Sequence, residues 1–183
     1  SHYVFAEKPA IYLYPTEDSI IDVHLDVNGR ITKDIPAYGK DGWEVFATKE
    51  GIIDGEYDYL FYEARLNKLD LPEEGWIVEY NEFSNWFDIN LNKLGLNEKE
   101  SYQFKEYWLE RLSKSNYYEI KLLSKEYLDE NMALNINPEP DTIIRLEFYF
   151  KPLKEFKKIN EPTIVTPIRQ GFTVVEWGGI LRG

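Results

Sequence analysis

Residues 20–35, IIDVHLDVNGRITKDI, alternate apolar and polar side chains with a period of two residues. Side chains on a strand point to opposite faces in turn, so this pattern predicts a strand with one buried face and excludes a helix. The apolar face carries Ile21, Val23, Leu25 and Val27, and the polar face carries Asp22, His24 and Asp26. The turn pair Asn28-Gly29 then predicts a β-hairpin. We favour a three-residue loop, because it keeps Ile31 and Ile35 on the apolar face.

Further short runs of strand-forming residues follow this segment. They cover residues 11–14, 42–47, 56–66, 75–80, 117–123, 142–150 and 172–177. Gly, Pro, Asp and Asn separate most of them, as in AYGKDG and LDLPEEG. Short strands at close spacing are typical of antiparallel sheets packed as a sandwich.

The periodicity changes to that of a helix between about residues 82 and 114. Apolar residues recur at helical spacing up to Leu94, and Gly95 stands where a helix C-cap glycine is expected. Asn97 and Glu100 resemble a capping box, which indicates the start of a second helix. The sequence therefore predicts a single α+β domain over residues 1–183, predominantly antiparallel and sandwich-like, with one inserted helical hairpin. The proline-containing stretch 151–171 is expected to be an ordered surface loop.

Composition limits the partners of this chain. Its formal net charge is -12, so nucleic acid and anionic membranes should be repelled, whereas cations and neutral ligands remain open. It has no cysteine, which excludes disulfides, zinc-thiolate sites and Cys nucleophiles. It has no apolar run of transmembrane or signal length and starts with SHYVF, so we expect it to be a piece of a longer protein with no segment inserted in a membrane.

Three stretches occur together that resemble one family of uncharacterised bacterial domains. They are KPAIYLYP near the start, LGLNEKESYQFKEYW in the middle and VVEWGG near the end, and they span Lys8 to Gly179. Some members of the family look like exported or lipid-anchored surface proteins. The resemblance implies a location at the cell surface and assigns no activity to any residue.

Familiar catalytic and cofactor motifs are absent. The sequence has no GxGxxG, GxxxxGK[ST], HExxH or GxSxG pattern, and we predict no cofactor. Asp22, His24 and Asp26 are the weak candidates for a metal site. Residues two apart on a strand lie about 7 Å from one another, which is too far for all three to share one ion. A solvated strand face explains the same alternation, and we favour it.

Two glutamates stand on strand faces that are otherwise apolar or aromatic. Glu63 shares a face with Tyr59 and Phe61, and Glu176 shares one with Phe172 and Val174. As a pair, the two carboxyl groups could perform acid–base hydrolysis, with Arg145 stabilising charge. Alternatively they are structural, and Arg145 is then the leading ion-pair partner of Glu176. We expect the face of Arg145 to be either exposed to water or covered by the helical hairpin.

Aromatic residues make up 16% of the chain and suggest a binding surface. Trp43, Trp76 and Trp177, with Tyr14, are the candidates for a platform that stacks on sugar rings or a peptide, although large aromatic residues are more often buried. We predict a non-catalytic, surface-exposed binding module for a neutral glycan or peptide. A hydrolase using Glu63 and Glu176 is the alternative, and a structural spacer is the third.

Overall fold

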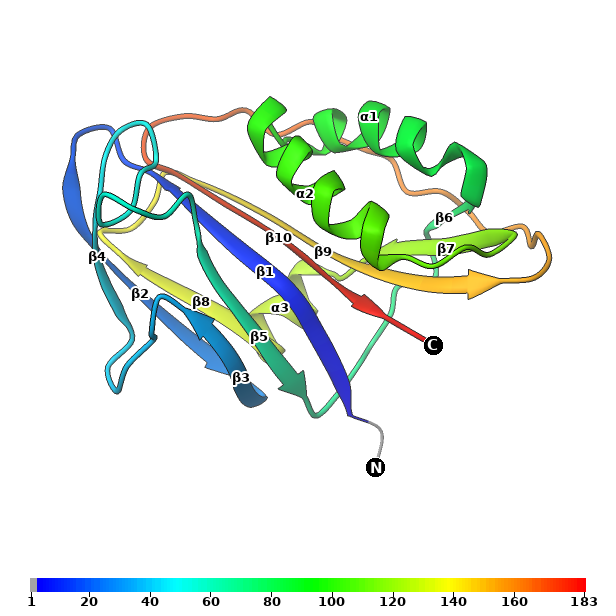
Figure 1. Cartoon of the computed structure of the whole chain (residues 1–183), viewed down its shortest axis with the longest axis horizontal. Coiled ribbons are helices and arrows are strands. Elements are labelled where there is room, and N and C mark those ends of the chain that lie inside the picture. Colours follow the sequence, from blue (N-terminus) through cyan, green and yellow to red (C-terminus); the bar gives the residue numbers. More distant parts are fainter. Residues whose placement is uncertain (1–2) are drawn as a thin grey trace.

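The computed structural model describes residues 3–183 (Figure 1). The strands are β1 Val4–Tyr14, β2 Ser19–Val27, β3 Gly29–Ile35, β4 Trp43–Ala47, β5 Leu60–Leu66, β6 Trp76–Glu79, β7 Tyr117–Leu122, β8 Met132–Asn137, β9 Thr142–Leu153 and β10 Thr173–Leu181. The helices are the 3-10 helix η1 Tyr80–Glu82 and the α-helices α1 Phe83–Leu94, α2 Glu98–Arg111 and α3 Lys125–Asn131. Within the described residues, no helix is long and apolar enough to cross a membrane.

The elements form three layers (Figure 1). A seven-stranded sheet with the order β3-β5-β1-β10-β9-β7-β6 lies in the middle, and a three-stranded sheet with the order β4-β2-β8 packs on one face. The hairpin of α1 and α2 covers the other face. All strand pairs are antiparallel except the parallel pair β9 and β10. The predicted α+β fold with sandwich-like sheets is therefore confirmed.

Two separate apolar cores hold the layers together. One lies between the two sheets and includes Ile21, Trp43, Tyr62 and Val174. The other lies between the large sheet and the helical hairpin and includes residues such as Phe87, Phe104, Trp108, Phe148 and Trp177. Because each central strand contributes to both cores, its two faces are both buried.

The local signals of the helical hairpin are confirmed. Gly95 takes the left-handed conformation with φ 114° after α1. Asn97 accepts a hydrogen bond from the Glu100 amide, and the Glu100 side chain accepts one from the Asn97 amide, which completes the capping box of α2. Glu100 is fully buried and also pairs with Arg169 from the long connection between β9 and β10. That ion pair fixes the connection against the start of α2.

The predicted hairpin over residues 20–35 is wrong. The strands β2 and β3 lie in different sheets, where β2 pairs with β4 and β8, and β3 pairs with β5. Asn28 makes the corner instead, because its amide donates to the Asn131 carbonyl and its carbonyl accepts from the Asn67 amide. At Gly29 a Cβ atom would lie 1.9 Å from the Arg65 carbonyl oxygen, so this corner requires glycine.

The face of β9 that carries Arg145 is neither exposed to water nor covered by the hairpin. The hairpin packs on the opposite face, which carries Ile144, Leu146 and Phe148. The face of Arg145 turns toward the small sheet and α3, where Tyr149 joins the core between the sheets. Our expectation for this face is thus corrected, because a second sheet buries it.

Candidate functional site

The strand β1 is interrupted by a bulge at Lys8 and Pro9. The register with both neighbouring strands shifts between Glu7 and Ala10 and between Ala6 and Ala10. Lys8 has φ 56°, a left-handed conformation that is uncommon for a residue with a long side chain. Its amide, turned out of the sheet, donates to Glu63 Oε2 at 3.1 Å. Strained backbone of this kind is often found at functional sites, so the bulge marks a candidate site.

Aromatic rings surround the side chain of Lys8. Its Nζ lies 4.0 Å from the ring centroid of Phe61, 5.1 Å from that of Tyr59 and 5.9 Å from that of Tyr107. Within residues 3–183 this ammonium group forms no ion pair. Its charge is stabilised by the faces of the rings, at about 0.5 to 2 kcal/mol for each favourable contact.

Two adjoining hollows, each of about 540 Å³, meet at Lys8, and we call them together the Lys8 groove. They share Lys8, Tyr59, Gln103 and Tyr107. The groove lies where β5 and the bulge of β1 face α2. Its aromatic wall is formed by Tyr57, Tyr59, Phe61 and Tyr107, and its charged side chains are Lys8, Lys33, Glu56, Asp58, Glu63, Glu106, Glu110 and Arg111. The groove is open and long rather than a closed pocket.

Hydrogen bonds anchor one side of the groove to the core beneath the hairpin. Trp177 Nε1 donates to the Tyr12 hydroxyl at 3.0 Å, and that hydroxyl donates to Gln103 Oε1 at 2.6 Å. Gln103 Nε2 in turn donates to Asp58 Oδ2. The Lys99 ammonium, 2.8 Å from Asp58, holds the pKa of that carboxyl group below its usual value. These contacts fix the position of Gln103 and Asp58 before any ligand binds.

A second set of contacts anchors the other side. Arg111 forms a bidentate ion pair with Glu7, with both distances 2.8 Å. The Tyr107 hydroxyl also donates to Glu7, at 3.1 Å. Burial, and then the charge of Glu7, raise the pKa of Tyr107, so its hydroxyl keeps its proton. The ring that covers Lys8 is therefore fixed in place.

The structure separates the two glutamates that the sequence singled out. Glu63 lies in the Lys8 groove, on the face of the large sheet that carries the hairpin. Glu176 is fully buried on the opposite face, in the layer between the sheets. The two carboxyl groups therefore do not meet at one opening, and their positions give no support to a joint acid–base role.

Glu176 belongs instead to a buried polar cluster, which we call the Glu176 cluster. Arg145 Nε donates to its Oε1 at 2.6 Å, and the Tyr62 hydroxyl donates to its Oε2 at 3.1 Å. Glu147 is the fourth member and is 1% exposed. Burial, and then the charge of Glu176, raise the pKa of Glu147 well above its usual value. The expected pairing of Glu176 with Arg145 is present, and Glu147 is the member that sequence reasoning did not identify.

We expect replacement of Glu147 by glutamine to change how stability depends on pH. Because the pKa of Glu147 is raised in the folded state, its stabilising contribution is complete below its ordinary value of 4.5 and is lost as the pH rises toward the folded value. Glu147→Gln removes that loss. The variant should match the parent at pH 4 and be more stable at pH 8 in urea unfolding. An equal difference at both pH values would contradict the assignment.

The candidate aromatic platform does not form on the surface. Trp43 is buried between the sheets, and Trp76 and Trp177 are buried under the hairpin. Tyr14 is half-buried and its hydroxyl donates to Glu100. Their expected role as a ligand platform is therefore not supported by their positions, because these residues fill the cores and connect the layers. The aromatic side chains that line the Lys8 groove are other residues.

Asp22, His24 and Asp26 lie on the outer side of β2, and His24 and Asp26 are exposed. They do not form a metal-binding group, and within residues 3–183 no three His, Asp or Glu side chains are gathered closely enough to hold a metal ion. These positions fit a solvated strand face.

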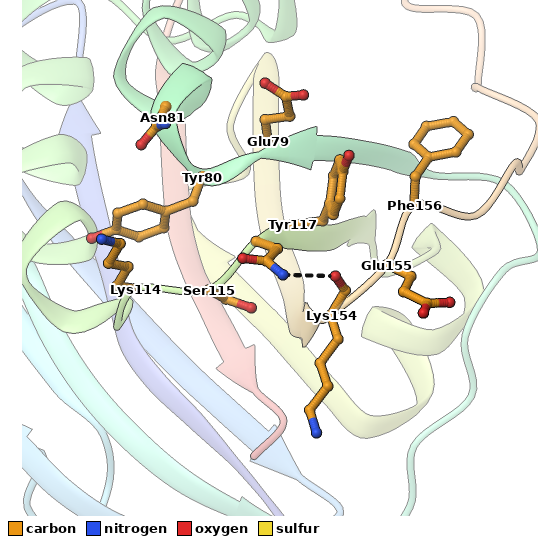
Figure 2. Close-up of a pocket in the computed structure, with 10 residues that line it drawn as sticks. Glu79, Tyr80, Asn81, Lys114, Ser115, Tyr117, Lys154, Glu155 and Phe156 are labelled. Atoms are coloured by element: carbon orange, nitrogen blue, oxygen red, sulfur yellow. Dashed lines mark hydrogen bonds between the residues drawn. The ribbon is translucent and has the colours of Figure 1, made fainter.

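A further hollow of about 580 Å³ lies at the β6 and β7 end of the large sheet (Figure 2). Tyr80 lies on one side of it and Phe156 on the other (Figure 2). Asn116 and Lys154 both line it, and the Asn116 side chain donates to the Lys154 carbonyl at 2.9 Å. Phe156 is 61% exposed, so this hollow offers an aromatic surface as well. It lacks the strained backbone of the Lys8 groove.

Comparison with known proteins finds a similarity to a bacterial sequence. It is 51% identical over 62 residues to an uncharacterized protein in the bglA 3' region of Butyrivibrio fibrisolvens. The match covers 31% of this chain and 65% of that relative, which is less than two thirds of the relative's length. No protein-family model matches the chain, and no solved structure matches it. The resemblance to uncharacterised bacterial proteins is thereby confirmed.

Proposed function

We propose that this protein is a non-catalytic, surface-exposed binding module, and that a neutral glycan binds in the Lys8 groove. The observation that carries the proposal is the wall of four aromatic side chains along an open groove beside a strained bulge. Tyrosine rings combine apolar area with a hydroxyl group, which suits the faces and edges of sugar rings. An open groove suits a chain of several sugar units.

The charges of the groove favour a neutral ligand over a polyanion. Three cationic and five carboxylate side chains line it. The protein as a whole is also strongly acidic, with a formal net charge of -12. Polyanionic ligands would be repelled both by the carboxylates of the groove and by the net charge of the whole protein. Sugar hydroxyl groups can form hydrogen bonds with carboxylates and ammonium groups alike.

The two other functions have less support in the geometry. The hydrolase predicted from the sequence would require Glu63 and Glu176 to share an opening, and Glu176 lies buried on the other side of the sheet. A structural spacer would not require an open aromatic groove with an unpaired ammonium group. The binding module accounts for both features.

A panel of neutral oligosaccharides, screened by isothermal titration calorimetry, tests the proposal. Tyr107→Leu should weaken binding at least about tenfold, because it removes a ring that lines both hollows of the groove. Phe156→Leu is the matched control, since it removes an exposed ring from the hollow in Figure 2.

If only Phe156→Leu loses binding, the ligand binds in the hollow of Figure 2 and not in the Lys8 groove. Binding of peptides but of no oligosaccharide would show that the ligand class is wrong. Binding of neither would refute the binding module at this groove.

A further inference from the structure

A smaller cavity opens between α3, β8 and β9, on the side of the large sheet away from the Lys8 groove. Its volume is about 320 Å³. The wall is formed by four aliphatic side chains and the guanidinium-bearing Arg145, with Lys125 and Asp129 also lining it. The aliphatic residues are Leu123, Leu128, Leu134 and Ile143. We call this the α3 cavity.

Arg145, which lines the α3 cavity, has a donor without a partner. Its Nη2 is buried and has no hydrogen-bond partner within residues 3–183. The Arg145 side chain is only 10% exposed, and its Nε is already used by Glu176. A buried donor of a charged group without a partner costs free energy, so a ligand that supplied an acceptor there would be favoured.

We propose that the α3 cavity binds a small aliphatic carboxylate, with its carboxylate at Arg145 and its chain against the leucine and isoleucine side chains. A guanidinium pairs best with a carboxylate, whose two oxygens accept its planar N–H groups. Burial of the alkyl chain against these side chains removes apolar surface from water and favours binding. The cavity holds about ten heavy atoms at the roughly 30 Å³ that one water molecule occupies in the liquid. An eight-carbon acid has this size.

Octanoate is the probe, and 1-octanol is the matched neutral compound. Titration of the isotope-labelled protein by ¹H–¹⁵N NMR should show shifts centred on α3, β8 and β9 with octanoate. 1-Octanol should bind at least about tenfold more weakly, because it lacks the charged acceptor.

Leu134→Phe fills the cavity and should weaken octanoate binding at least about tenfold. Ile89→Phe, on an exposed position of α1, is the control and should leave binding unchanged. Equal affinity for octanoate and 1-octanol would overturn the role of Arg145. Absence of binding by the parent, or undiminished binding by Leu134→Phe, would overturn the site itself.

Discussion

Arg145→Met should lower the free energy of unfolding by about 3 to 5 kcal/mol at pH 7, the loss expected when one partner of a buried ion pair is removed. The melting temperature should fall by roughly 10 °C. The reason is that Glu176 is fully buried and receives its only cationic contact within residues 3–183 from Arg145. Without that contact a carboxylate is left uncompensated between the sheets.

A double variant separates this explanation from a simple loss of packing. Glu176→Gln replaces the carboxylate with a neutral amide of the same shape, so Arg145→Met combined with Glu176→Gln should recover part of the loss. Arg30→Met is the control, because Arg30 is exposed on β3 and surface substitutions usually change stability by less than about 0.5 kcal/mol. A double variant that is no more stable than Arg145→Met would mean that packing alone is affected.

Gly178→Ala should destabilise the protein by about 3 kcal/mol, at the upper end of what overpacking usually costs. A Cβ atom at this position would lie 2.6 Å from Glu147 Oε1 and 2.9 Å from Pro9 Cα. The second contact is with backbone, so rotation of a side chain cannot relieve it. Guanidinium-induced unfolding measures the loss, and Gly183→Ala, where a Cβ would meet nothing within 4 Å, is the control.

Gly179 makes room on the opposite face. A Cβ there would lie 2.7 Å from Trp108 Cζ2 in α2. The two glycines of VVEWGG thus make room on opposite faces of the sheet. Gly178 allows the bulge of β1 to approach closely, and Gly179 allows the helical hairpin to do so. If Gly178→Ala unfolds at the same denaturant concentration as the parent, this explanation is wrong.

Local signals were sufficient to predict the helical hairpin and most of the strands. Gly95 and the pair Asn97 and Glu100 are short-range signals, and they act as their residue types suggest. The short helix α3 was missed because seven residues are too few for helical periodicity. β8 was missed although Met132, Leu134 and Ile136 alternate with less apolar residues, a signal that was available.

The wrong hairpin shows the limit of local reasoning. An Asn-Gly pair between alternating strands favours a tight turn, but the partners of Asn28 are Asn67 and Asn131, which are distant in sequence. Nothing in residues 20–35 alone indicates that β2 and β3 would join different sheets. Strand pairing was decided by contacts between distant residues.

The candidate site was predictable only in part. Glu63 was singled out, and in the structure it accepts a hydrogen bond from the Lys8 amide. The aromatic wall was not found, because Tyr107 reaches Lys8 across about a hundred residues of sequence. Only the packing of α2 on the large sheet brings these side chains together.

The position of β10 has a consequence for the order in which the molecule can assemble. β10 pairs with β1 on one side and with β9 on the other, yet it follows every other strand in the chain. Until residues 173–181 are available, β3-β5-β1 and β9-β7-β6 are two partial sheets with unpaired edges. A nascent chain therefore carries these open edges from the time each strand is made until β10 is made, and closure by such distant pairing is intrinsically slow.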